Sequence, residues 1–153
     1  MCSKYYLLLL LLVVGCGEQK TGFPSKEALV QQHINNCNSK DYQAYIETFH
    51  PKCQKVINKT FPNNSYQKLW LKANGNPIPK DAKIEYSEKP FMSFPSNYTY
   101  EIKPNNFVHI EFEVGNRSTS KYVELANINN QWHQVAPNLP KEHVENIKQS
   151  FNK

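Results

Sequence analysis

The chain has 153 residues, with 18 basic and 13 acidic side chains and a formal net charge of +5. This length accommodates one domain of ordinary size with its own core. The basic residues are scattered among carboxylates, so we expect no nucleic-acid partner.

The first fifteen residues have the parts of an export signal. Lys4 provides a positive charge, an apolar run occupies residues 5–14, and the small residue Gly15 precedes Cys16. These are the features of a segment that is cleaved after export. A helix needs about 20 apolar residues to cross a bilayer, so the run is too short for a good membrane-spanning anchor.

The residues Val13-Val14-Gly15-Cys16 resemble the lipobox of bacterial prolipoproteins. The resemblance implies cleavage before Cys16, diacylglycerol on its thiol and an acylated new amino terminus. Several acyl chains give lasting membrane attachment. Gly17 stands where inner-membrane lipoproteins of Gram-negative bacteria carry aspartate, which implies the periplasmic side of the outer membrane. The alternative is an ordinary secretory signal with a chance cysteine.

These features predict three segments. Residues 1–15 are the lipoprotein signal peptide, and residues 16–23 form a lipidated, polar and flexible tether. Residues 24–153 form a single α+β domain. Cleavage would leave 138 of the 153 residues and lower the net charge from +5 to +4, because only Lys4 is basic in the removed part.

Two cysteines, Cys37 and Cys53, belong to the predicted domain. Export to an oxidising compartment favours a disulfide between them. Such a bond would close a loop of about 16 residues and contribute about 3 kcal/mol in the chain-entropy model. The alternative is two buried thiols too far apart to meet. No CxxC or paired-histidine spacing is present, so we expect no metal site and no cofactor.

Helical periodicity dominates the first half of the domain. Ser25 is suited to cap a helix that reaches Cys37, and Asp41 is suited to begin a second helix that Pro51 stops or bends. The stretch 53–61 is ambiguous. Ser65 is suited to cap a further helix, which ends at Asn74-Gly75. The apolar positions of these helices recur at helical spacing, and they are Leu29, Val30, Ile34, Tyr42, Tyr45, Ile46, Phe49, Tyr66, Leu69 and Trp70.

The second half changes to a period of two. Residues 83–88 alternate, as do Tyr98, Tyr100 and Ile102, and Val108–Val114 has the pattern of a half-buried antiparallel strand. A strand over Ser120–Ile128 turns at Asn129-Asn130 into a last strand, residues 131–135. A short C-terminal helix follows Pro140. Helices first and strands afterwards predict an α+β fold, with the helices packed on one face of a curved antiparallel sheet.

The order of elements resembles the NTF2-like (SnoaL-like, cystatin-like) superfamily. The local likeness lies in Asn38-Ser39-Lys40-Asp41-Tyr42 leading to Tyr45, Phe49, His50 and Pro51, and in Asn129-Asn130-Gln131-Trp132. The resemblance implies a cone with an open end and a small-molecule cavity. The family includes isomerases, dehydratases, polyketide cyclases and non-catalytic binding modules, so the fold alone does not decide the function.

Acid–base candidates for an enzyme are Asp41, His50, His109 and His133. Asp41 is explained by the start of a helix, and His50 by a helix end. The alternation along its strand places His109 outside the core. Trp132 and His133 are neighbours in a strand, so only one of these two side chains can point inward. No histidine has a sequence-local partner, so we name no catalytic residue.

Aromatic side chains are abundant and are candidates for a cavity lining, although a simple core explains them as well. Candidate pocket residues are Tyr42, Tyr45, Phe49, Tyr66, Trp70, Tyr98, Tyr100, Phe112 and Trp132. We expect a non-catalytic, membrane-anchored protein that binds a small ligand or an envelope protein partner. The alternatives are a small isomerase or hydrolase-like enzyme that uses an Asp, His or Tyr in the cone, and an immunity or inhibitor-type lipoprotein.

Overall fold

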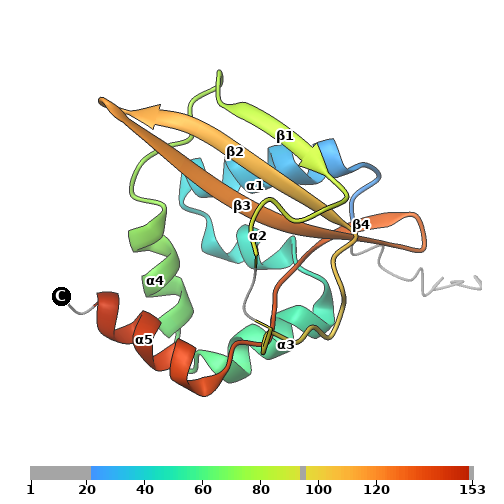
Figure 1. Cartoon of the computed structure of the whole chain (residues 1–153), viewed down its shortest axis with the longest axis vertical. Coiled ribbons are helices and arrows are strands. Elements are labelled where there is room, and N and C mark those ends of the chain that lie inside the picture. The colour runs from blue at the N-terminus through green and yellow to red at the C-terminus, as the bar shows by residue number, and fades with distance from the viewer. Residues whose placement is uncertain (1–21, 94–95, 152–153) are drawn as a thin grey trace, which may run out of the picture.

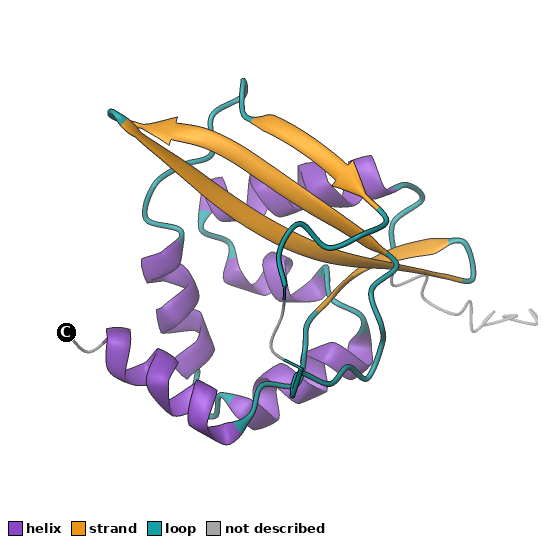
Figure 2. Cartoon of the chain, in the orientation of Figure 1, coloured by secondary structure: helices purple, strands orange, loops and turns teal. Residues whose placement is uncertain are grey.

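The computed structural model describes residues 22–93 and 96–151, and it contains helices and one antiparallel sheet (Figures 1 and 2). The predicted signal peptide, Cys16 and most of the predicted tether lie outside the described residues. The described elements follow in the order α1 (Lys26–Ser39), α2 (Tyr42–Glu47), α3 (Pro51–Thr60), α4 (Ser65–Ala73), β1 (Lys83–Ser87), β2 (Asn106–Val114), β3 (Arg117–Ile128), β4 (Gln131–Val135) and α5 (Lys141–Phe151). The predicted α+β class and the C-terminal helix are confirmed.

The first two helices begin at the predicted capping residues. The Ser25 hydroxyl accepts a hydrogen bond from the Ala28 N–H, and the Asp41 carboxylate accepts one from the Ala44 N–H. Each cap satisfies one of the backbone donors that a helix leaves free at its start. Lys40, with a φ of 58°, ends α1 in the left-handed region and turns the chain into α2.

The ambiguous stretch is helical. Pro51 occupies the first turn of α3, where its missing N–H costs no hydrogen bond, and the His50 ring accepts a hydrogen bond from the Lys52 N–H. The predicted cap of α4 is wrong by one residue. Asn64 precedes the helix with a φ of 58° and makes no side-chain cap, and Ser65 is its first residue.

The sheet has the order β1-β2-β3-β4, every pair is antiparallel, and it is not closed into a barrel. Asn129 and Asn130, with φ of 52° and 61°, form the predicted tight turn between β3 and β4. Two consecutive positive φ angles match the twist of a two-residue hairpin loop, and asparagine tolerates them well. The hairpin between β2 and β3 turns at Gly115, whose φ is 62°.

One face of the sheet carries the core. Val108, Ile110 and Phe112 of β2 lie beside Val123 and Leu125 of β3, and all five are buried. Figure 1 shows α1 and α2 behind the sheet, while the segment that joins β1 to β2 crosses in front of it. The predicted inner row of β2 is therefore confirmed.

The two orientations predicted for histidines are also tested by the register. His109 lies on the face opposite this row, as predicted, because it pairs with Tyr122. Trp132 lies on the side of Leu125 and Gln134, whereas His133 points to the other face. His133 is nevertheless buried, so both faces of the sheet are covered at β4.

The free edge of β4 is paired with segments from the N-terminal half. Phe23 and Trp132 exchange two backbone hydrogen bonds of 2.9 and 2.8 Å. Gln134 accepts a hydrogen bond from the His50 N–H and donates one to the Thr48 carbonyl. These contacts protect the edge of the sheet. Phe23, assigned to the tether from sequence, is thus part of the domain.

The predicted strand at Tyr98–Ile102 is absent from the structure. Only Thr99 makes an isolated bridge, to Asn138, and the surrounding segment is a loop. The hydroxyl groups of its two tyrosines instead bond to the side chains of Glu124 on β3 and His143 on α5. None of the described helices is both long and apolar enough to cross a membrane.

Candidate functional site

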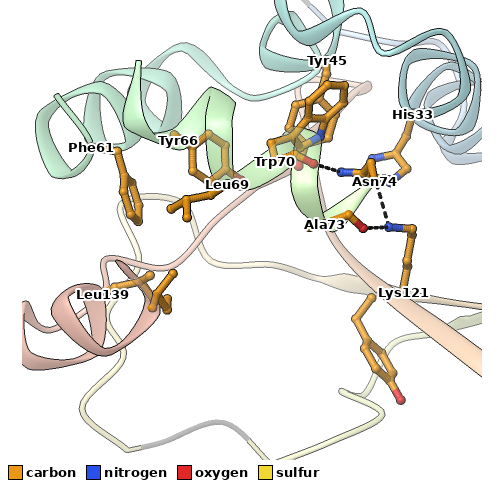
Figure 3. Close-up of a pocket in the computed structure, with 12 residues that line it drawn as sticks. His33, Tyr45, Phe61, Tyr66, Leu69, Trp70, Ala73, Asn74, Lys121 and Leu139 are labelled. Carbon is orange, nitrogen blue, oxygen red and sulfur yellow. Dashed lines mark hydrogen bonds between the residues drawn. The ribbon is translucent and has the colours of Figure 1, made fainter. Parts of the chain in front are cut away.

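A cavity of about 290 Å³ lies among α1, α2, α4, β3 and α5 (Figure 3). Tyr45, Tyr66 and Trp70 line it, so three of the nine predicted pocket residues meet there. Its other lining residues are His33, Phe61, Leu69, Ala73, Asn74, Lys121, Tyr122, Leu139 and Ile147. Residues of α4, β3 and α5, together with His33 of α1 and Tyr45 of α2, enclose this space.

The cavity has a polar end and an apolar end. Figure 3 shows His33, Asn74 and Lys121 gathered on one side, and Phe61, Leu69 and Leu139 on the other. The aromatic wall between them is continuous. The Trp70 ring lies 4.8 Å from that of Tyr45, and the Tyr66 ring lies 5.2 Å from that of Phe61. This combination of an apolar lining and a few polar groups is typical of small-molecule sites.

Behind the polar end, a buried hydrogen-bond network joins α1, α2 and β4. The Gln134 side-chain carbonyl lies 3.1 Å from His33 Nδ1 and also 3.1 Å from the Thr48 hydroxyl. The Gln134 amide donates to the Tyr45 hydroxyl at 3.4 Å. These groups are buried and satisfy one another, which fixes the side chains on the cavity wall.

His33 and Cys37 form a neutral pair, because burial disfavours the charged form of each. The Cys37 Sγ lies 3.6 Å from His33 Nε2. Burial lowers the pKa of His33 to about 4 and raises that of Cys37 to about 11. If His33 Nδ1–H donates to Gln134, the bare Nε2 accepts from the thiol. At neutral pH a neutral thiol is a poor nucleophile, and a neutral imidazole is a poor acid.

Lys121 and Asn74 close the polar end. The Lys121 ammonium donates to the Ala73 carbonyl at 3.2 Å and to the Asn74 side-chain carbonyl at 2.7 Å. The Asn74 amide in turn donates to the Trp70 backbone carbonyl. A cation beside the last carbonyls of α4 is favoured by the helix dipole.

The remaining predicted pocket residues lie elsewhere. Phe49 and Phe112 are buried in the core, and Tyr42 packs on the outer edge of Trp70, at 5.6 Å. Trp132 is half-buried at the β4 edge. Tyr100 donates to Glu124 at 2.8 Å, and the Tyr98 hydroxyl lies 2.9 Å from His143. These six residues do not line this cavity.

None of the four predicted acid–base candidates lines the cavity. Asp41 and His50 cap helices, as expected. His109 lies on the outer sheet face, 3.0 Å from the Ser120 hydroxyl and 3.7 Å from Glu85. The His133 ring lies 5.0 Å from that of His50, and burial lowers its pKa.

Cys37 and Cys53 are both free and buried, so the structure does not contain the predicted disulfide. Cys37 faces His33 on α1, whereas Cys53 on α3 lies near Ala136 and Glu124. The two thiols are held by different elements and partners. Among the described residues, no group of three His, Cys, Asp or Glu side chains is placed to hold a metal ion.

Sequence reasoning missed the polar end of the cavity. His33 lies at helical spacing between Val30 and Ile34, and it was not among the acid–base candidates taken from the sequence. Lys121 alternates with Val123 and Leu125 on the inner face, so a lysine within an apolar row was the available signal. A scan against protein-family models, a search of curated proteins and a search of solved structures each found no match for this chain.

Proposed function

We propose that this chain is a bacterial lipoprotein, anchored through Cys16, whose domain binds a small ligand in the cavity between α4 and the sheet. The anchor rests on the sequence of the first sixteen residues, with localisation at the periplasmic side of the outer membrane. The ligand-binding role rests on one observation, the roughly 290 Å³ cavity with an apolar end and a polar end.

An NTF2-like architecture is part of this proposal. The helical hairpin α1–α2, the additional helices and the antiparallel sheet that follows them support it. The sheet is not a closed barrel, and α3 stands where a short strand is common in that superfamily. The fold therefore supports a ligand cavity without indicating a reaction.

The anchor is tested by metabolic labelling with radioactive palmitate in a bacterial host. We expect label on the wild-type protein and none on Cys16→Ser. Cys2→Ser is the matched control, because this cysteine lies within the removed segment, and it should retain the label. Label that persists in Cys16→Ser would contradict lipidation at this residue.

The cavity is tested by calorimetric titration of the full chain, held in lipid nanodiscs, with hydrocinnamyl alcohol, a neutral phenyl-bearing probe. Empty nanodiscs provide the blank. We expect saturable binding that Leu69→Trp abolishes by filling the apolar end. Leu71→Trp is the matched control, because Leu71 lies on the same helix but is exposed. Binding that survives Leu69→Trp unchanged would place the probe elsewhere.

A protein partner is the second candidate, and a specific surface favours it. Phe91, Met92 and Tyr122 are 38%, 42% and 43% exposed. The His109 ring stacks on Tyr122 at 4.9 Å and lies 5.5 Å from Phe91, so Phe91, His109 and Tyr122 form one patch on the outer sheet face, and exposed Met92 follows Phe91 in the chain. Exposed apolar patches often mark interaction sites.

This second candidate is tested with a photo-crosslinking amino acid at Met92 in growing cells. A single protein adduct is expected, and the same amino acid at exposed Leu71 should give none. Equal, heterogeneous adducts at both positions would argue against a docking surface.

A further inference from the structure

Lys121 is a charged residue on an otherwise apolar face of the sheet. It pairs across the ladder with Ile110, and two residues later Val123 is fully buried. Its ammonium group is half-buried, and burial lowers its pKa. The two hydrogen bonds to Ala73 and Asn74 use two of its three N–H donors.

No carboxylate balances this charge within the part of the chain that the structure describes. The ion pairs recorded there join Lys83 and His109 to Glu85, and Lys148 to Glu145. The titratable groups near Lys121 are His33 and Cys37, and burial keeps both neutral. A partly desolvated cation without a counter-charge stabilises an anion placed beside it.

Trp70 provides a second unused donor on the same cavity wall. Its side chain is only 4% exposed, and its indole N–H has no hydrogen-bond partner among the described residues. A buried donor without a partner is destabilising, and an acceptor on a ligand would satisfy it. Asn74 bonds both to Lys121 and to the Trp70 backbone carbonyl, so the Lys121 ammonium and the Trp70 backbone lie at the same end of the site.

We propose that the cavity binds a small organic monocarboxylate with an apolar body, whose carboxylate pairs with Lys121 and which can also accept from the Trp70 indole. This inference rests on the ligand-binding function proposed above. One ammonium group and one indole N–H match a single negative charge better than a phosphate dianion, which is commonly held by arginines. Phe61, Leu69 and Leu139 would contact the apolar body.

The test compares hydrocinnamate with hydrocinnamyl alcohol, which share a phenylpropyl body and differ in the charged group. Both are titrated into the full chain in nanodiscs by calorimetry, with empty nanodiscs as the blank. We expect the carboxylate to bind about tenfold more tightly or better, because a hydrogen bond to a charged acceptor is stronger than one to a neutral hydroxyl group. Phenyl phosphate should bind more weakly than hydrocinnamate.

Three variants assign the preference to residues. Lys121→Met should reduce the ratio of the two affinities to about one, and Lys121→Arg should retain a preference. Trp70→Phe should weaken the binding of hydrocinnamate, because it removes the indole N–H while it keeps an aromatic ring on the cavity wall. Lys83→Met, at an exposed lysine paired with Glu85, is the matched control and should change neither affinity.

The outcomes separate this inference from the proposed function. If the alcohol binds as tightly as the acid, or if Lys121→Met keeps the preference, the carboxylate inference is overturned and a ligand cavity remains. If neither compound binds, both proposals are overturned. The comparison on the wild-type chain decides between these results even where a variant fails to fold.

Discussion

His33 on α1 and Gln134 on β4 are joined by a buried hydrogen bond of 3.1 Å between Nδ1 and Oε1. The two residues are 101 positions apart in the chain. The bond connects the wall of the cavity to the last strand, and Thr48 and Tyr45 contact the same amide. It therefore ties the N-terminal hairpin to the sheet.

The first prediction concerns this amide. Gln134→Leu should lower the free energy of unfolding by about 2 kcal/mol, because it leaves the buried His33 Nδ1 without its acceptor and the buried Tyr45 hydroxyl without its donor. Urea denaturation followed by tryptophan fluorescence measures this. Gln43→Leu removes an exposed glutamine bonded to Glu47 and should stay within about 0.5 kcal/mol of wild type. Equal effects of the two variants would argue against the network.

The second prediction concerns pH. The pKa of His33 is lowered from 6.5 to about 4 by burial, so the unfolded state binds its proton first as the pH falls. The associated stability is present above pH 6.5 and is lost between pH 6.5 and about 4, by about 3 kcal/mol. His33→Gln cannot titrate, so its free energy of unfolding should fall less across this window.

The pKa values of His50 and His133 are also lowered, so these two histidines also make stability depend on pH. Their contribution is present in both wild type and His33→Gln, so the difference between the two proteins reports on His33 alone. The measurement is the difference in the free energy of unfolding between wild type and His33→Gln at each pH. A difference that stays constant from neutral pH to pH 4 would falsify the assignment.

The third prediction concerns the segment before α1. A methyl group on Gly22 would lie 2.7 Å from Gln131 Cβ and 2.7 Å from His133 Nε2. Gly22→Ala should therefore cost about 1–3 kcal/mol, as overpacking does. Gly75→Ala is the control, since its new methyl group would lie an ordinary 3.5 Å from the Lys72 carbonyl. Thermal unfolding should separate the two variants, and a Gly22→Ala protein as stable as Gly75→Ala would show that this segment is not packed on β4.

The fourth prediction concerns the β3–β4 turn. Asn130 has a φ of 61°, so a β-branched side chain there is strained. Asn130→Val should cost about 1–2 kcal/mol, while Asn130→Gly should be neutral or stabilising, because Asn-Gly is preferred in this turn. Urea denaturation gives both values. The opposite order would indicate a different turn.

The fifth prediction concerns the thiols. Alkylation of the denatured chain without reductant should modify both Cys37 and Cys53, since they are free in the structure. Alkylation of the folded chain should spare them, because they are 3% and 1% exposed. Peptide mass spectrometry reads out each site. Labelling that requires prior reduction would instead support the disulfide expected from the compartment.

The sequence determined the local features of this protein. Ser25 and Asp41 indicate the starts of helices, and Asn129-Asn130 indicates a turn. These side chains interact with backbone groups within a few residues, so their effect can be read locally. The alternation along Val108–Val114 likewise indicated one buried strand face. The order of helices and strands followed from such local signals, and so did the α+β class.

Tertiary structure decided the site. Lys121 and Trp70 come from different elements, and no local pattern shows that Asn74 bonds to both. Alternation at Tyr98, Tyr100 and Ile102 suggested a strand, but side-chain partners such as Glu124 and His143 hold this segment as a loop. Similarly, the sequence suggested a disulfide between Cys37 and Cys53, but the two thiols are buried on separate helices, α1 and α3, and each has its own neighbours. Contacts between distant residues depend on packing, which spacing along a chain does not encode.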